Sequence, residues 1–116
     1  MTSVVHVRKA KFTVYIGRKY HEFEESKWHN PSSHLAEGYD RHLALYDCYQ
    51  RLIKSPDLLA SIPELKDQIL GCWCKPKDCH GDILAALADN KPLPDYLRDW
   101  EGFRKKYYPD KSQDLT

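Results

Sequence analysis

The stretch that decides the fold is Gln68–Asp89, with the sequence QILGCWCKPKDCHGDILAALAD. It opens with a short apolar run, Gln68–Cys74, of the kind that forms a buried strand. A turn rich in lysine, proline and aspartate follows, and from His80 onward apolar residues recur at helical spacing until Asn90 and Pro92 end the pattern. A strand, a short turn and a helix in this order are typical of α/β layer architectures.

Further elements are predicted on the N-terminal side of this stretch. The β-branched runs at 4–7 and 12–16 predict two more strands, and the polar segment 18–33 predicts a long loop. A helix is predicted over 33–54, capped by Ser32 or Ser33 and ended by Pro56. Its predicted apolar stripe consists of Leu35, Tyr39, Leu43, Tyr46, Tyr49 and Ile53. Three strands alternating with helices predict a small α/β domain with a short, mostly parallel sheet flanked by helices.

The chain has the length of a single domain, 116 residues. We expect an α/β domain over residues 1–90, with an aromatic-rich C-terminal helix and tail over 91–116 packed on it. In that tail, the spacing of Tyr96, Trp100, Phe103 and Tyr107 predicts one terminal helix.

Composition excludes several classes of protein. The formal net charge is +1, which gives no strong sign of nucleic-acid binding. No apolar run is long enough to span a bilayer, and the first residues lack the pattern of a signal peptide, so we expect no membrane partner and a cytoplasmic protein. Four cysteines in a reducing compartment more often bind metal or do chemistry than form disulfides.

The turn after the predicted strand combines three features that point to a site. Cys72 and Cys74 alternate with Trp73, so the two thiols share a face of the strand. Cys74 lies at the carboxyl end of that strand, where open α/β sheets bind ligands. Cys79 and His80 begin the next helix, whose free N–H groups and positive dipole end favour anions and lower a thiol pKa.

Three interpretations of this turn stay open. Cys72, Cys74, Cys79 and His80 have the residue types of a zinc site, although their spacing departs from the usual paired knuckles. Alternatively, Cys74, Cys79, His80 and Gly81 line a ligand pocket in which His80 or Asp82 transfers protons or holds a sugar or phosphate. In the third interpretation, the thiols are small buried apolar groups and His80 caps the helix.

Four residues outside the turn are candidate ligand contacts. Arg18 follows Gly17 at the end of a predicted strand, where a guanidinium can fork onto a phosphate or carboxylate, or can form a surface ion pair. Trp28 and Asn30 fall in the predicted loop. Trp28 can stack on a base while Asn30 reads its edge; otherwise the ring fills the core and the amide makes a turn before Pro31.

The motifs quoted above resemble a known family. GCWC, then Pro76, then CHGD, together with VHVRK at 5–9, VYIGR at 14–18 and SKW at 26–28, is similar to the signature of domain of unknown function 4326, found in bacteria and bacteriophages. The resemblance covers about residues 4–90. His29 stands where members usually carry glycine, and residues 19–25 look like an insertion. The CHGD turn is also similar to that of domain of unknown function 488, which implies a Rossmann-like fold that handles nucleotides or nucleosides.

Two functions are therefore expected from the sequence. In the first, the chain binds or processes a nucleotide-like small molecule, with His80 or Asp82 as acid or base and with Gly17, Arg18 and the helix start as ligand contacts. In the second, it is a non-catalytic module that docks on a protein or nucleic acid, with zinc as a possible structural cofactor. Spacing alone assigns no nucleophile–base pair, so it does not make the chain an enzyme.

Overall fold

The computed structural model describes residues 1–30 and 38–107 of the chain. Its sheet has three strands, β1 (Ser3–His6), β2 (Val14–Tyr15) and β3 (Ile69–Cys72), in the spatial order β1-β3-β2. Both pairs are parallel, and Gly71 lies in register with Val5 on one side and Tyr15 on the other. The expected small α/β domain with a short parallel sheet is confirmed, and β3, from the stretch quoted first, is its central strand.

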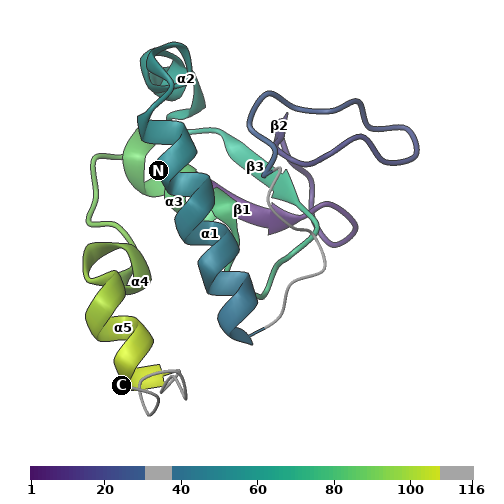
Figure 1. The fold of residues 1–116 in the computed structure, drawn as a ribbon. Coiled ribbons are helices and arrows are strands. Elements are labelled where there is room, and N and C mark those ends of the chain that lie inside the picture. The colour runs from purple at the N-terminus through teal and green to yellow at the C-terminus, as the bar shows by residue number, and fades with distance from the viewer. Residues whose placement is uncertain (31–37, 108–116) are drawn as a thin grey trace.

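Helices gather on one side of this sheet, and the long excursion after β2 extends from the other side in the view of Figure 1. β3 is followed by a turn and then by the helix α3, as the strand–turn–helix pattern predicts. The helical elements are α1 (Gly38–Ile53), α2 (Pro56–Ser61), the 3-10 helix η1 (Ile62–Leu65), α3 (His80–Ala88), α4 (Asp95–Arg98) and α5 (Trp100–Tyr107).

The core lies between the sheet and α3. Alternation along β3 points Leu70 and Cys72 to this side, where both are buried. They belong to one apolar cluster with Ile16 beyond β2 and with Ile83 of α3. Burying such side chains stabilises the fold by roughly 1.5–3 kcal/mol each.

The opposite face of the sheet is covered by aromatic rings instead of a helix. Phe12 lies directly on Gly71, because a Cβ added there would come within 2.6 Å of the ring. Tyr15 stacks on Phe23 at 4.6 Å between ring centroids, and Trp73 packs edge-on against Phe23 at 5.9 Å. Trp73 therefore points away from Cys72, as the alternation predicts.

Helix α1 follows its predicted apolar stripe only in part: Tyr49 packs against the core as predicted. Leu45 and Leu52 are in the core, whereas Ile53, predicted to be part of the stripe, is 38% exposed. The helix is rotated so that the row containing Leu45 and Leu52, seven residues apart, faces the core beside α3. The predicted start and caps at Ser32 and Ser33, and the stripe residue Leu35, lie outside the described residues.

The C-terminal segment forms two short helices where one was predicted. Asp99 separates α4 from α5 with a non-helical backbone, and its carboxylate Oδ1 accepts a hydrogen bond from the Gly102 N–H. Tyr96 is buried, and Trp100 and Phe103 pack against the core from these helices. Across the described ranges, no helix combines the length and apolar character needed to cross a bilayer.

Candidate functional site

A cavity of about 740 Å³ opens at the carboxyl ends of β2 and β3. Its walls come from the segment after β2, from the first described turn of α1 and from the turn between β3 and α3. The described residues that line it are Tyr15, Gly17, Arg18, Lys19, Tyr20, Asn30, Arg41, Cys72, Trp73, Cys74, Lys75, Pro76, Lys77 and His80. A cavity of this size fits a small-molecule ligand, and its place is the usual one for a ligand in an open α/β sheet.

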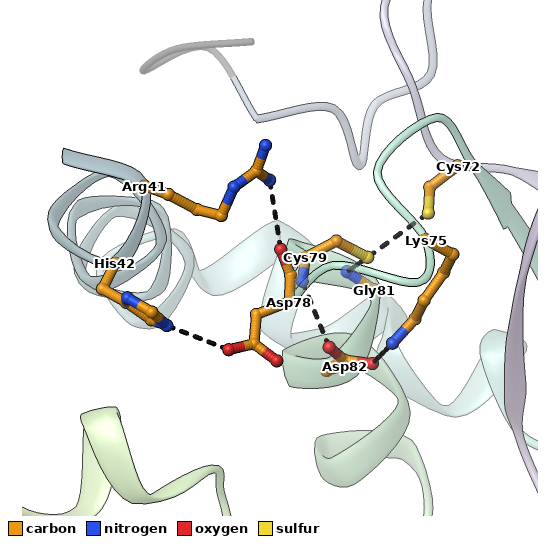
Figure 2. A network of polar contacts seen from close by, with 8 residues as sticks. All are labelled: Arg41, His42, Cys72, Lys75, Asp78, Cys79, Gly81 and Asp82. Atoms are coloured by element: carbon orange, nitrogen blue, oxygen red, sulfur yellow. Dashed lines mark hydrogen bonds and ion pairs between the residues drawn. The ribbon is translucent and has the colours of Figure 1, made fainter. Parts of the chain in front are cut away.

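The start of α3 is fixed by a capping box. Cys79 is the N-cap, and its thiol accepts a hydrogen bond from Gly81 N–H at 3.2 Å. The Asp82 carboxylate reaches back to Cys79 N–H at 3.1 Å and also pairs with Lys75 Nζ at 2.5 Å, as Figure 2 shows. These bonds satisfy main-chain donors that a helix start would otherwise leave unpaired.

Gly81 has a packing role rather than a contact with the cavity. A Cβ added at this position would lie 2.7 Å from Val4 Cγ1 and 2.9 Å from Ile16 Cδ1. Only glycine therefore lets the first turn of α3 lie this close to β1 and to the end of β2. Gly17 does line the cavity, and there a Cβ would meet the hydroxyl of Tyr15 at 2.5 Å.

Helix α1 is tied to the same turn through Asp78. His42 Nε2 lies 2.9 Å from the Asp78 carboxylate, and Arg41 Nη1 donates to the Asp78 main-chain carbonyl at 3.2 Å. Figure 2 shows both side chains extending from α1 toward the turn. The pair of contacts places the Arg41 guanidinium at the cavity wall.

The thiols of Cys72 and Cys79 are in contact below the cavity, with 3.3 Å between their Sγ atoms (Figure 2). The hydrogen bond from Cys79 lowers the pKa of the Cys72 thiol to about 6, with main-chain N–H groups of Lys75 and Cys74 as further causes and burial opposing them. The same hydrogen bond, followed by burial, raises the pKa of Cys79. Of the two thiols, Cys72 is therefore the one that loses its proton first.

The residues predicted as zinc ligands do not form one ligand set. Cys79 Sγ is engaged by Gly81 N–H, and His80 Nε2 lies 2.7 Å from the carbonyl oxygen of Ile16. Over residues 1–30 and 38–107, no three His, Cys, Asp or Glu side chains are grouped so that they could hold a metal ion. The geometry gives zinc no support.

His80 is a link between segments. Its ring is buried beneath the cavity, and burial lowers its pKa, although contacts with the main chain of Ile16 and Trp28 act in the opposite sense. The neutral imidazole is thus the favoured form in the folded protein. The ring holds the end of β2 and the segment near Trp28 against the start of α3.

Arg18 and Asn30 meet at the cavity, but through the main chain of Asn30. Arg18 Nε and Nη2 both donate to the Asn30 carbonyl, at 3.2 and 3.1 Å. The Tyr15 hydroxyl donates to the Arg18 carbonyl and accepts a hydrogen bond from Trp73 Nε1 at 2.8 Å. These bonds close the excursion after β2 into a fixed wall.

Trp28 lies away from the large cavity. Its ring is 5% exposed, belongs to the core and lines a separate apolar cavity of about 300 Å³. Lys27 Nζ lies 5.2 Å from the ring centroid on one side. The indole therefore fills the core, the second of the two readings that the sequence left open.

Most of the basic and aromatic residues of the cavity wall were not predicted from the sequence. Lys19, Arg41, Lys75 and Lys77 join Arg18 there, and no Asp or Glu among the described residues lines the cavity. The Lys75 ammonium also forms an ion pair with Asp82. The rings of Tyr15, Tyr20 and Trp73 supply the apolar wall, and Tyr20 is 52% exposed. Lys75 and Lys77 flank Pro76 in the quoted stretch, which was the one available signal.

Comparison with known proteins agrees with the resemblance described above. The model of the family "Domain of unknown function (DUF4326)" matches residues 4–90. An uncharacterised protein, R718, of Acanthamoeba polyphaga mimivirus is 36% identical in an alignment 86 residues long, which covers 64% of this chain and 65% of that protein.

A second relative is an uncharacterised 12.4 kDa protein in the nrdA-td intergenic region of Enterobacteria phage T4, which is 48% identical over 40 residues. That match covers 34% of this chain and 37% of the phage protein. The chain thus spans less than two thirds of the length of either relative. No solved structure matches the chain at a significant level.

Proposed function

The chain belongs to the DUF4326 family, and we propose that it binds a nucleotide-like molecule, with phosphate groups and a flat ring, in the cavity at the carboxyl ends of β2 and β3. One observation carries this proposal: the described residues of the cavity wall include five basic side chains and no Asp or Glu, and aromatic rings complete the wall. Such a wall attracts anions and offers ring faces to a planar group.

Three segments contribute the basic side chains that would receive phosphate. Lys75 and Lys77 come from the turn before α3, Lys19 from the segment after β2, and Arg41 from α1. Ammonium and guanidinium groups make charge-assisted hydrogen bonds with phosphate oxygens, each worth about 1.5–3 kcal/mol. The convergence of three segments favours a ligand with more than one anionic oxygen over a single surface counter-ion.

Tyr20 is the side chain proposed to receive the ring of the ligand. It is half exposed at the cavity, and its ring packs edge-on against Trp73, with 5.0 Å between ring centroids. Stacking of a base on an aromatic side chain is worth about 1–3 kcal/mol. This contact would distinguish a nucleotide from inorganic phosphate.

His80 and Asp82 support the site in this proposal. Each Asp82 oxygen already accepts a hydrogen bond, and the buried His80 ring holds the Ile16 carbonyl. Both residues keep the cavity wall in place, and neither is assigned an acid or base step. Arg18 likewise uses two donors of its fork on the Asn30 carbonyl and shapes the wall.

Calorimetric titration at low salt tests the proposal with four probes: inorganic phosphate, a nucleoside, a nucleoside monophosphate and a nucleoside triphosphate. We expect the phosphorylated nucleosides to bind more tightly than inorganic phosphate or the nucleoside, and the affinity to fall as salt rises. Equal or absent heats for all four probes would reject a nucleotide site.

Two variant pairs separate the contributions. The double variant Lys19→Glu/Lys77→Glu should weaken binding of the phosphorylated probes by roughly tenfold or more, since charge-assisted bonds are lost. Lys91→Glu removes an exposed positive charge remote from the cavity wall and should leave binding unchanged. Tyr20→Ala should weaken nucleotide binding about fivefold or more without changing the weaker phosphate binding, whereas Tyr20→Phe should retain both.

A further inference from the structure

The contact between Cys72 and Cys79 is not needed for ligand binding, and it brings together two reactive groups from different elements. Cys72 ends β3, and Cys79 caps α3 after the turn. Their Sγ atoms are 3.3 Å apart, and their exposed fractions are 1% and 0%. A disulfide bond is about 2.05 Å long, so a small closing movement would join the two sulfurs.

Of the two cysteines, Cys72 faces the cavity. It is among the lining residues, while Cys79 lies behind it and is not. A small uncharged oxidant that enters the cavity therefore meets Cys72 first. The lowered pKa of Cys72 and the basic side chain of Lys75 near it favour the thiolate, which is the nucleophilic form of cysteine.

We propose that Cys72 and Cys79 form a redox-active dithiol, which hydrogen peroxide converts into an intrachain disulfide between β3 and α3. Cys72 is the residue that attacks the peroxide, and Cys79 is the residue that closes the disulfide. The proposal is independent of what the cavity binds, because it uses only the paired sulfurs and access for a molecule as small as peroxide.

The chemistry balances in two steps. The Cys72 thiolate attacks one peroxide oxygen, an S–O bond forms, the O–O bond breaks, and the leaving hydroxide takes a proton to become water. Cys79 then loses its proton and attacks the Cys72 sulfur; the S–S bond forms, the S–O bond breaks, and the second hydroxide leaves as water. Two thiols are oxidised, and one peroxide is reduced to two waters.

Cys74 and Cys48 provide matched comparisons within the chain. Cys74 also lines the cavity and is half-buried, so it is more accessible than Cys72, but no sulfur contact involves it among the described residues. Cys48 lies on α1, and burial raises its pKa to about 11, which disfavours its thiolate. Neither residue should be needed for the disulfide.

Peptide mapping of the whole protein tests the proposal. The reduced protein is treated with a small excess of hydrogen peroxide, the remaining thiols are blocked under denaturing conditions, and the protein is cut with trypsin. Cleavage after Lys77 places Cys72 in peptide 67–77 and Cys79 in peptide 78–98, with Cys48 in a third peptide. We expect peptides 67–77 and 78–98 to be linked, with the loss of two hydrogen atoms, and to separate on reduction.

Variants identify which thiol in peptide 67–77 is linked. The linkage should persist in Cys74→Ser and Cys48→Ser and be lost in Cys72→Ser and Cys79→Ser. Serine is a good N-cap, so Cys79→Ser keeps an acceptor for Gly81 N–H, and circular dichroism of the reduced variants checks their fold. Linkage that persists without Cys72, or wild-type protein in which peroxide modifies Cys74 and leaves Cys72 and Cys79 reduced, would overturn the proposal.

Discussion

The two ends of strand β3 differ in the charged side chains around them: acidic residues lie at the amino end and basic residues at the carboxyl end. At the amino end, Thr2 donates to both oxygens of Asp89, through its N–H and its hydroxyl, each at 2.8 Å. The terminal amine of Met1 pairs with Asp67 at 2.6 Å. The acidic end is therefore closed by donors from the chain itself.

At the carboxyl end of the same strand, basic side chains line a cavity of about 740 Å³. Parallel pairing puts the ends of β2 and β3 together, so the segments that follow them must diverge and leave a hollow. The amino end therefore pairs its carboxylates with donors of the chain, whereas the carboxyl end gathers five basic side chains around an open cavity.

The largest expected effect comes from the middle of β3, on which both ends depend. Leu70 is fully buried, so Leu70→Ala should lower the free energy of unfolding by about 2–5 kcal/mol, because it removes apolar contacts and leaves a cavity. Urea unfolding followed by circular dichroism measures it. Leu59→Ala, at a leucine that is 37% exposed, should change stability by less than about 0.5 kcal/mol. Equal effects of the two variants would contradict the position of the core.

The next largest effect is expected from His80, beside the cavity at the carboxyl end of β3. His80→Gln should cost about 1–3 kcal/mol at pH 7, since it disturbs a buried hydrogen bond to Ile16. The pKa of His80 is lowered by burial from its ordinary 6.5, so the unfolded chain binds the proton more readily. Wild-type stability should thus be fully present above pH 6.5 and decline as the pH falls through the lowered pKa.

Thermal unfolding between pH 7.5 and pH 5 measures this decline, at pH values set roughly one unit either side of the ordinary histidine pKa. The decline should be shallower in His80→Gln. His21→Asn removes an exposed histidine whose backbone φ of 51° asparagine tolerates, and it should keep the wild-type slope. A wild-type slope that survives in His80→Gln would assign the acid sensitivity to another group.

The smallest effect belongs to the closed end. Hydrogen bonds from the Thr2 side chain and main chain hold the pKa of Asp89 below its ordinary 3.8. A lowered acid pKa stabilises the fold above the ordinary value, and that stability is lost as the pH falls through the lowered one. Asp89→Asn should lower the melting temperature slightly at pH 7 and not at pH 2.5, a pH taken to lie roughly one unit below an ordinary carboxyl pKa.

Asp47→Asn serves as the control for Asp89→Asn, because Asp47 is an exposed carboxylate on α1 with no described side-chain hydrogen bond. It should show no such difference between the two pH values. Identical melting curves for wild type and Asp89→Asn at both pH values would mean that the acidic end contributes nothing to stability.

Local patterns determined the elements around the candidate site. Apolar runs and helical periodicity placed β3 and α3, with the helix beginning at Cys79 or His80. The interpretation in which His80 caps the helix is wrong, because Cys79 is the N-cap. Cys74 and His80 were placed at the cavity by the same strand–turn–helix argument. These features depend on residues close together in the chain, so the local sequence is enough to predict them.

Tertiary structure decided which distant residues meet there. Arg41 reaches the cavity wall only because α1 docks on Asp78, and Tyr20 only because the segment after β2 folds back. Trp28 fills the core, Cys72 lies against Cys79, and α1 buries Leu45 and Leu52, which lie outside the predicted stripe. These outcomes depend on how whole elements pack, because the free energy of burying a side chain is set by its final neighbours and not by its sequence context.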